Sequence, residues 1–134
     1  MYIRWIVYTR NKREARDIIE DALSVIKDHM QRCRYLSAKP YWKFDDSYIV
    51  EMKLKLQDGS LDYFIKFLNG ISECWHLNVD GGNSTDSSII AANNCNEFIN
   101  KKISWMWVGF DRETECGFFE ELRETLIKCR QKVY

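Results

Sequence analysis

The 134-residue sequence has little of what marks loop-dominated or strongly charged proteins. It contains one proline and no excess charge, because 20 Lys and Arg balance 20 Asp and Glu. No overall field therefore draws the chain to nucleic acid or to an anionic membrane, and recognition by charge has to be local. With 46% hydrophobic and 14% aromatic residues, the composition argues against disorder and predicts one domain over residues 1–134.

Paired cysteines and long apolar runs are also missing. The five cysteines are odd in number and widely spread, without a C-x-x-C pair, which favours a reducing compartment. The first apolar run, residues 5–8, is too short for a signal-peptide core or a membrane span. We therefore expect a cytoplasmic protein that makes no use of a membrane.

Catalytic and metal-binding motifs are scarce as well. The sequence has no G-x-G-x-x-G and no phosphate-loop lysine motif. His29 and His76 have no second histidine at the spacing of metal ligands. Cys74 and His76, two apart on an expected strand, point the same way, but no third group is present to orient a proton transfer. We expect no cofactor, no metal and no catalysis.

The clearest pattern that is present lies in residues 48–57. Apolar side chains take every second position there: Tyr48, Val50, Met52, Leu54 and Leu56. Charged and polar residues fill the gaps, with Ile49 as the exception. This alternation predicts a half-buried strand with a fixed register, because a slip of one residue would put three charges into the core.

Further strands are expected at residues 2–9, 34–44, 75–79 and 103–110, the last of these apolar on both faces. Asn11 stands three residues before Glu14, the spacing of a capping box, so a helix begins there and ends near residues 30–32. Ser60 and Asp111 are expected to cap two more helices. Residues 80–88 are expected to be an exposed loop. Residues 89–100 fit a short strand and a helical turn equally well.

The order of these elements predicts an α+β fold. It matches a ferredoxin-like β-α-β-β-α-β antiparallel sheet, extended by a fifth strand and a C-terminal helix. In such a fold the two helices cover one face of the sheet.

Charge is segregated along the chain. Residues 44–100 hold 3 Lys and Arg against 9 Asp and Glu, a net charge of −6. Tryptophan and tyrosine, which anchor many interfaces, are frequent beside this acidic region, and an acidic rim would steer a basic partner. The candidate contact residues are Trp42, Asp45, Asp46, Glu51, Asp80 and Asp86. The alternative is that the aromatics are core residues and the charges a solvated surface.

In size, in its α/β plan, in its lack of a catalytic motif and in its acidic, aromatic middle, the chain resembles the small immunity proteins that bacteria encode beside contact-dependent growth inhibition and other polymorphic toxins. This resemblance implies a non-enzymatic cytoplasmic protein that binds one cognate toxin, through the toxin's C-terminal toxic domain, and blocks its active site or substrate surface.

Two other functions stay open. One is a nucleic-acid-binding or processing domain, in which exposed aromatics of a ferredoxin-like sheet stack bases and the basic N-terminal third holds phosphates. The other is a small enzyme whose site is assembled from residues distant in the sequence.

Overall fold

The structure, a computed structural model, describes residues 1–79, 86–92 and 98–132. Within these ranges six strands form one antiparallel sheet: β1 (Tyr2–Tyr8), β2 (Met30–Pro40), β3 (Ser47–Leu56), β4 (His76–Val79), β5 (Asp86–Ala92) and β6 (Ile103–Asp111). The helices are α1 (Lys12–Leu23), a 3-10 helix η1 (Ser24–His29), α2 (Leu61–Ile71) and α3 (Arg112–Lys132). The predicted α+β class is confirmed.

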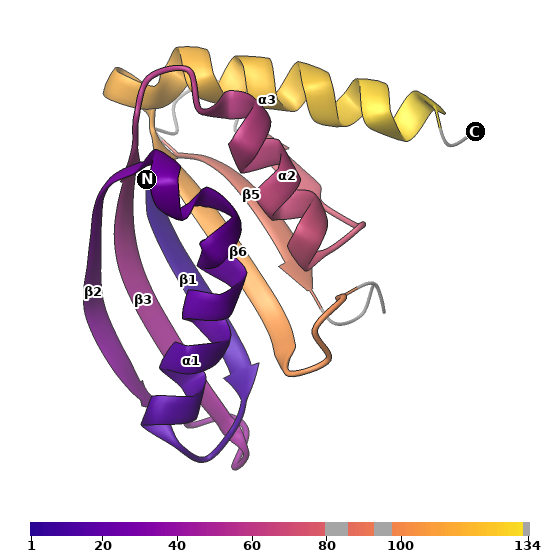
Figure 1. Cartoon of the computed structure of the whole chain (residues 1–134). Coiled ribbons are helices and arrows are strands. Elements are labelled where there is room, and N and C mark those ends of the chain that lie inside the picture. Colours follow the sequence, from indigo (N-terminus) through magenta and orange to yellow (C-terminus); the bar gives the residue numbers. More distant parts are fainter. Residues whose placement is uncertain (80–85, 93–97, 133–134) are drawn as a thin grey trace.

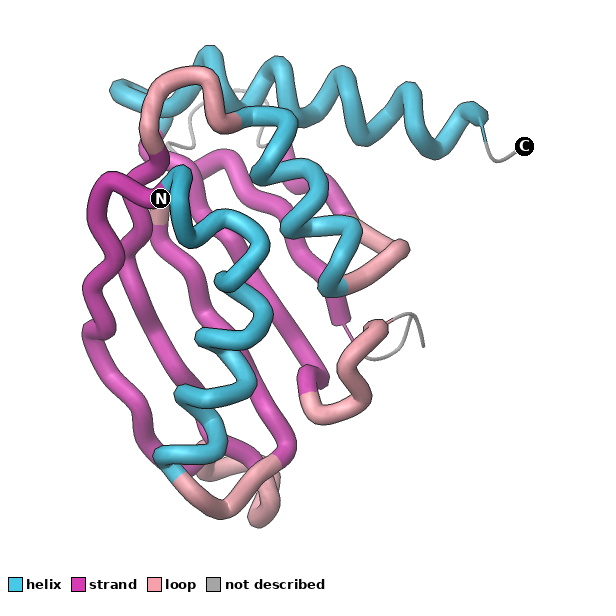
Figure 2. Tube along the Cα trace, in the orientation of Figure 1, coloured by secondary structure: helices cyan, strands magenta, loops and turns pink. Residues whose placement is uncertain are grey.

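The layers are simple. In Figure 1, α1 and α2 lie side by side over one face of the sheet, and α3 crosses one end of it. Figure 2 shows the same two-layer arrangement along the backbone trace. In the described part of the chain no helix lies over the other face, which we call the outer face. No helix among the described residues is long and apolar enough to cross a membrane.

The strand order differs from the ferredoxin-like prediction. The order is β2-β3-β1-β6-β5-β4, so β2, β3 and β1 keep the expected arrangement with α1 as the crossover. The strand that follows α2 does not pair with β1. It lies at the far edge of the sheet, and the chain returns through β5 to β6, which takes the place beside β1. The additional strand is β5, which includes Asp86, Ser87 and Ser88, expected to be loop.

The alternation that predicts β3 is confirmed. Val50, Met52 and Leu54 are buried under the helices, whereas Lys53 and Lys55 are exposed. β1 lies between β3 and β6 and contributes Trp5, whose Nε1 donates to Met52 Sδ at 3.3 Å. Its ring packs edge-on against Phe67 of α2, 6.2 Å between centroids. These contacts fix the register of the central strands against the helix layer.

The N-cap bonds predicted for Asn11 are present at the start of α1, whereas the predicted return bond from Glu14 is replaced by other contacts. Asn11 Oδ1 accepts hydrogen bonds from the backbone N–H groups of Arg13 (2.8 Å) and Glu14 (3.3 Å). Glu14 does not return to the cap, because its carboxylate pairs with Lys102 and the Asn11 N–H donates to Thr9 Oγ1. The α-helix ends at Leu23 and continues as η1, so β2 begins four residues before the predicted position 34.

The C-terminal helix is anchored at its start. Glu115 accepts from the backbone N–H of Asp111 at 2.9 Å and pairs with the N-terminal amino group at 3.0 Å. The buried side of the helix follows the sequence periodicity, with Phe119, Leu122 and Leu126 in the core. These contacts bring the N-terminus of the chain to the end of the sheet that α3 crosses (Figure 1).

Candidate binding surface

The central strands give the outer face an aromatic surface. Because Ile3, Trp5 and Val7 of β1 point inward, the side chains between them point outward. On β1 and β6 these outward residues are Tyr2, Arg4, Ile6, Tyr8, Trp105, Trp107 and Gly109, aligned by the register of the two strands. Most of them are partly exposed. In the described part of the chain no helix covers this surface, so the aromatic side chains face solvent.

A groove of 790 Å³ lies at the Tyr8 end of this face. We call it the aromatic groove. Its apolar lining comes from the strands and from the connection between β2 and β3: Ile6, Tyr8, Ile49, Trp105, Tyr41, Trp42 and Phe44. Its charged lining is mostly basic, with Arg4, Lys39 and Lys43 against Glu51.

The connection over residues 41–46 holds the exposed rings in place. Tyr41 N–H donates to the Ser47 carbonyl at 2.8 Å, and Ser47 N–H donates to the Phe44 carbonyl at 3.2 Å. The Tyr41 ring contacts both neighbouring rings, with centroids 6.2 Å from Trp42 and 5.8 Å from Phe44. An ion pair between Arg10 and Asp46 ties the turn to the start of α1. The exposed aromatics are therefore held by a structured turn.

The exposure of these rings is unusual for a packed domain. Trp42 is 82% exposed and Phe44 is 57% exposed. Of the seven large apolar side chains exposed in the described residues, three line the groove: Tyr8, Trp42 and Phe44. Clustered exposed apolar side chains mark interaction sites more often than scattered ones do.

At the edge of the groove, Arg4 also organises a second cluster. Its Nε binds Glu51 Oε1 at 3.1 Å, and its guanidinium lies 5.8 Å from the Tyr2 ring and 6.0 Å from the Trp107 ring. The two rings meet edge to face at 5.6 Å. Burial and the hydrogen bond with Glu51 raise the pKa of the Tyr2 phenol above its ordinary value.

The six residues predicted from the sequence do not form one patch. Trp42 and Glu51 line the aromatic groove. Asp45 and Asp46 lie on the same turn but do not line it. Asp86 begins β5 at the opposite end of the sheet, in register with Asp111. Asp80 lies outside the described residues.

Sequence reasoning missed most of the groove. Ile6, Tyr8 and Trp105 come from β1 and β6, in which the sequence analysis names no contact residue. Two signals pointed to them: Ile49 interrupts the polar side of β3, and residues 103–110 are apolar on both faces. An apolar residue on the solvent side of a strand indicates a contact surface when no helix is available to cover it.

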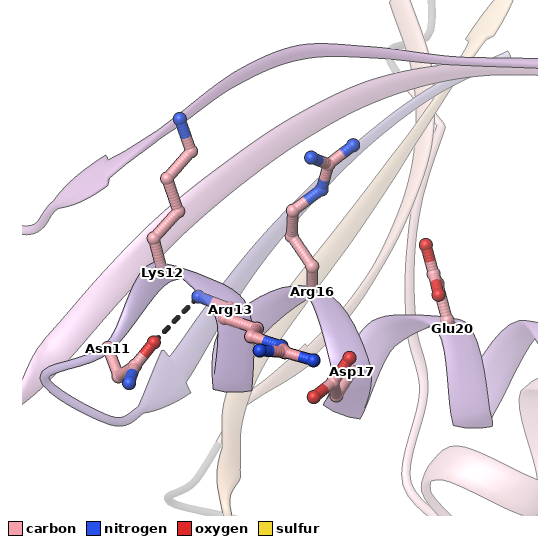
Figure 3. Close-up of a pocket in the computed structure, with 6 residues that line it drawn as sticks. All are labelled: Asn11, Lys12, Arg13, Arg16, Asp17 and Glu20. Atoms are coloured by element: carbon pink, nitrogen blue, oxygen red, sulfur yellow. Dashed lines mark hydrogen bonds between the residues drawn. The ribbon is translucent and has the colours of Figure 1, made fainter.

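A second hollow, of 610 Å³, lies on α1 and is drawn in Figure 3. Its lining residues are Asn11, Lys12, Arg13, Arg16, Asp17 and Glu20. Opposite charges follow one another along this side, and Arg16 lies over the Tyr35 ring at 4.4 Å. The pattern is typical of a solvated helix face with i,i+4 pairs, and we assign it no ligand.

Cys74 and His76 are closer than the sequence analysis implied. Sγ lies 3.6 Å from Nε2, within contact distance for sulfur. The contact by itself assigns no chemistry to the pair. Among the described residues no group of three or more His, Cys, Asp or Glu side chains is placed to hold a metal ion.

No family model, curated protein or solved structure matches the chain. Function therefore has to be inferred from the geometry and charge of the outer face.

Proposed function

We propose that the chain is a non-enzymatic binding protein that holds another protein in the aromatic groove. The observation that carries this proposal is the position of Trp42, which is 82% exposed on a hydrogen-bonded turn at the groove. Tryptophan is over-represented among the residues that dominate binding energy at interfaces, because it buries a large rigid surface at little entropic cost.

The partner we propose is the C-terminal toxic domain of a bacterial polymorphic toxin, with the chain acting as its cytoplasmic immunity protein. The class comes from the sequence resemblance, and the groove supplies a surface large enough to seat a protruding loop of such a domain. The charge of the groove changes the sign of charge expected on the partner. Because Arg4, Lys39 and Lys43 outnumber Glu51, the complementary patch on the partner should be acidic rather than basic.

The test begins with the gene immediately upstream, where we expect a toxin reading frame, and uses the C-terminal domain of that toxin as the ligand. Isothermal titration should detect a complex, and co-expression of the chain should protect cells from that domain. Trp42→Ala should raise the Kd by about 30-fold or more, the loss typical of an interface hot spot. Circular dichroism should show an unchanged fold, because the Trp42 ring is mostly in solvent.

Two tyrosines provide a matched control. Tyr8 in the groove is 41% exposed, and Tyr63 on α2 is 42% exposed on the helical side of the sheet. Tyr8→Ala should weaken the complex, whereas Tyr63→Ala should leave it unchanged. Equal effects of the two substitutions, or no protection from the toxic domain, would contradict the proposal.

A further inference from the structure

Four exposed basic side chains cluster on the outer face at the β2 edge of the sheet. We call Arg32, Arg34, Lys53 and Lys55 the basic strip. The register places Arg34 directly opposite Lys53 and Arg32 directly opposite Lys55. None of the four forms an ion pair with another described residue. The strip lies at the opposite end of β3 from the aromatic groove.

This arrangement is unfavourable for the isolated domain. Directly opposed side chains of an antiparallel pair lie about 5 Å apart at Cβ, and like charges there repel. Edge strands commonly carry lysine or arginine to block aggregation, which explains the charges on β2. It does not explain Lys53 and Lys55 on the neighbouring interior strand. Two like-charged cross-strand pairs indicate an anionic ligand that offsets their repulsion.

Aromatic rings adjoin the strip. Tyr2 is in register with Lys53 on one side and with Gly109 on the other. The Trp107 ring lies over Gly109 and contacts Tyr2 at 5.6 Å. The Arg4 guanidinium lies within 6.0 Å of both ring centroids. Two rings and a guanidinium thus form a platform directly beside four cations.

The described strand positions of the outer face carry mostly basic charge. The acidic residues among them include Glu51, which is paired with Arg4, and Asp111, which follows Gly109 in the outward alternation of β6. Other acidic side chains lie on the helices, for example Asp17 and Glu20 of α1 and Glu121 of α3. Although the whole chain has a formal net charge of zero, this face of the sheet is mostly basic, and it is therefore complementary to a polyanion.

We propose that this end of the outer face binds single-stranded nucleic acid, with Tyr2 and Trp107 stacking unpaired bases and the basic strip holding phosphates. An acidic protein surface would match the charges but would leave the rings beside them without a role. Single-strand binding combines both features, because bases stack on aromatic side chains while a basic track follows the backbone. This function goes beyond toxin binding, which uses the aromatic groove toward the other end of the face, and the two surfaces meet at Arg4 and Glu51.

The experiment measures the anisotropy of a labelled oligodeoxythymidine of about 16 nucleotides, a length within the range of known single-strand sites. Between about 50 and 200 mM salt, four phosphate contacts on a single strand should give a log–log slope of roughly −3. Lys53→Glu should weaken binding and reduce the steepness of this slope by about 1. Lys66→Glu, on α2 at the other face, is the matched charge reversal and should leave both unchanged.

A second pair of variants separates stacking from charge. Trp107→Leu and Tyr2→Leu should each weaken binding by about 10-fold with the salt slope unchanged, because stacking releases no counterions. Circular dichroism and thermal melting confirm that each variant is folded. Trp42→Ala should bind the oligonucleotide as the wild type does, so failure here and failure of the proposed toxin binding are distinguishable.

Three results would overturn the inference. The first is binding that does not depend on salt. The second is an equal effect of Lys53→Glu and Lys66→Glu. The third is a poly-glutamate peptide that binds as tightly as the oligonucleotide and is insensitive to Tyr2→Leu and Trp107→Leu, since this would make the strip a surface for an acidic protein.

Discussion

The indole ring of Trp107 occupies the space that a side chain at Gly109 would need. A Cβ built at position 109 would lie 2.3 Å from Trp107 Cη2, far inside van der Waals contact. The indole ring therefore lies along β6, over Gly109 and beside Tyr2. A glycine two residues on is what allows a tryptophan to lie flat on the outer face in this position.

Gly109→Ala is therefore expected to displace the Trp107 ring. Overpacking of this kind typically costs about 1–3 kcal/mol, and chemical denaturation should show a loss in that range. Gly117→Ala is the matched control, because Gly117 lies in α3 with nothing within 4 Å of an added Cβ. That substitution should stabilise the protein by about 0.5–1 kcal/mol. Equal losses at the two positions would contradict the packing described here.

The elements that sequence predicted best are those with a strong local period. β3 alternates through its whole length, and its inward residues Val50, Met52 and Leu54 are buried as expected. In α3 the buried residues Phe119, Leu122 and Leu126 likewise recur at helical spacing. Local periodicity reports which face a residue occupies, because it depends only on neighbours along the chain.

Local periodicity does not reveal the order of the strands in the sheet. β5 begins with Asp86, Ser87 and Ser88, which read as loop, and becomes a strand because it pairs on both sides with β4 and β6. Because residues 86–88 are predicted as loop, the ferredoxin-like prediction places the strand after α2 beside β1, where the structure has β6. A short strand was one of the two alternatives for residues 89–100, and β5 does include residues 89–92. The sequence carries no local signal that pairs this strand with β4 and β6, because such pairing is long-range.

Charge counted along the chain was a poor guide to charge on a surface. The acidic segment 44–100 contains Lys53 and Lys55, which face outward beside Arg34 and Arg32. Its acidic residues are dispersed, with Asp46 paired to Arg10 and Glu51 paired to Arg4. Neighbouring residues of a strand point to opposite faces, so only the register of the sheet reveals which charges meet.

Relief of the repulsion in the basic strip should be measurable in the free protein. Lys53→Glu places a carboxylate opposite Arg34 and should raise the free energy of unfolding by about 0.2–1 kcal/mol. Lys53→Gln removes the repulsion without adding an attraction and should fall between wild type and Lys53→Glu. Both gains should shrink in about 1 M salt, where exposed charges are screened. A loss of stability in Lys53→Glu would show that the two cations do not repel.

The cap of α1 gives a separate test of local structure. Asn11→Ala removes the acceptor of the Arg13 and Glu14 N–H groups and should cost about 1 kcal/mol, within the usual range for an N-cap. Asn11→Ser keeps an acceptor at this position and should retain most of the stability. Urea denaturation at neutral pH distinguishes the two, and an equal loss in both variants would argue against the cap.

Tyr35 predicts how stability changes in alkaline solution. Burial, the nearby Glu20 carboxylate and the Cys33 thiol raise the pKa of Tyr35 from 10.0 to about 12, and the Arg16 guanidinium over the ring opposes this only in part. The folded state thus holds the phenolic proton more tightly than the unfolded chain does, so this contribution to stability is complete below pH 10.0 and is lost as the pH rises toward 12.

Tyr35→Phe should leave the free energy of unfolding at neutral pH nearly unchanged, because the hydroxyl is buried without a hydrogen-bond partner among the described residues. The same substitution should flatten the decline of stability above pH 10.0. Urea denaturation from neutral to alkaline pH measures the decline, and absorbance titration of the folded protein should show that Tyr35→Phe removes the phenol that ionises near 12. Glu20→Gln, which removes one cause of the shift, should move that ionisation toward 10.0, and an unchanged titration in both variants would contradict the assignment.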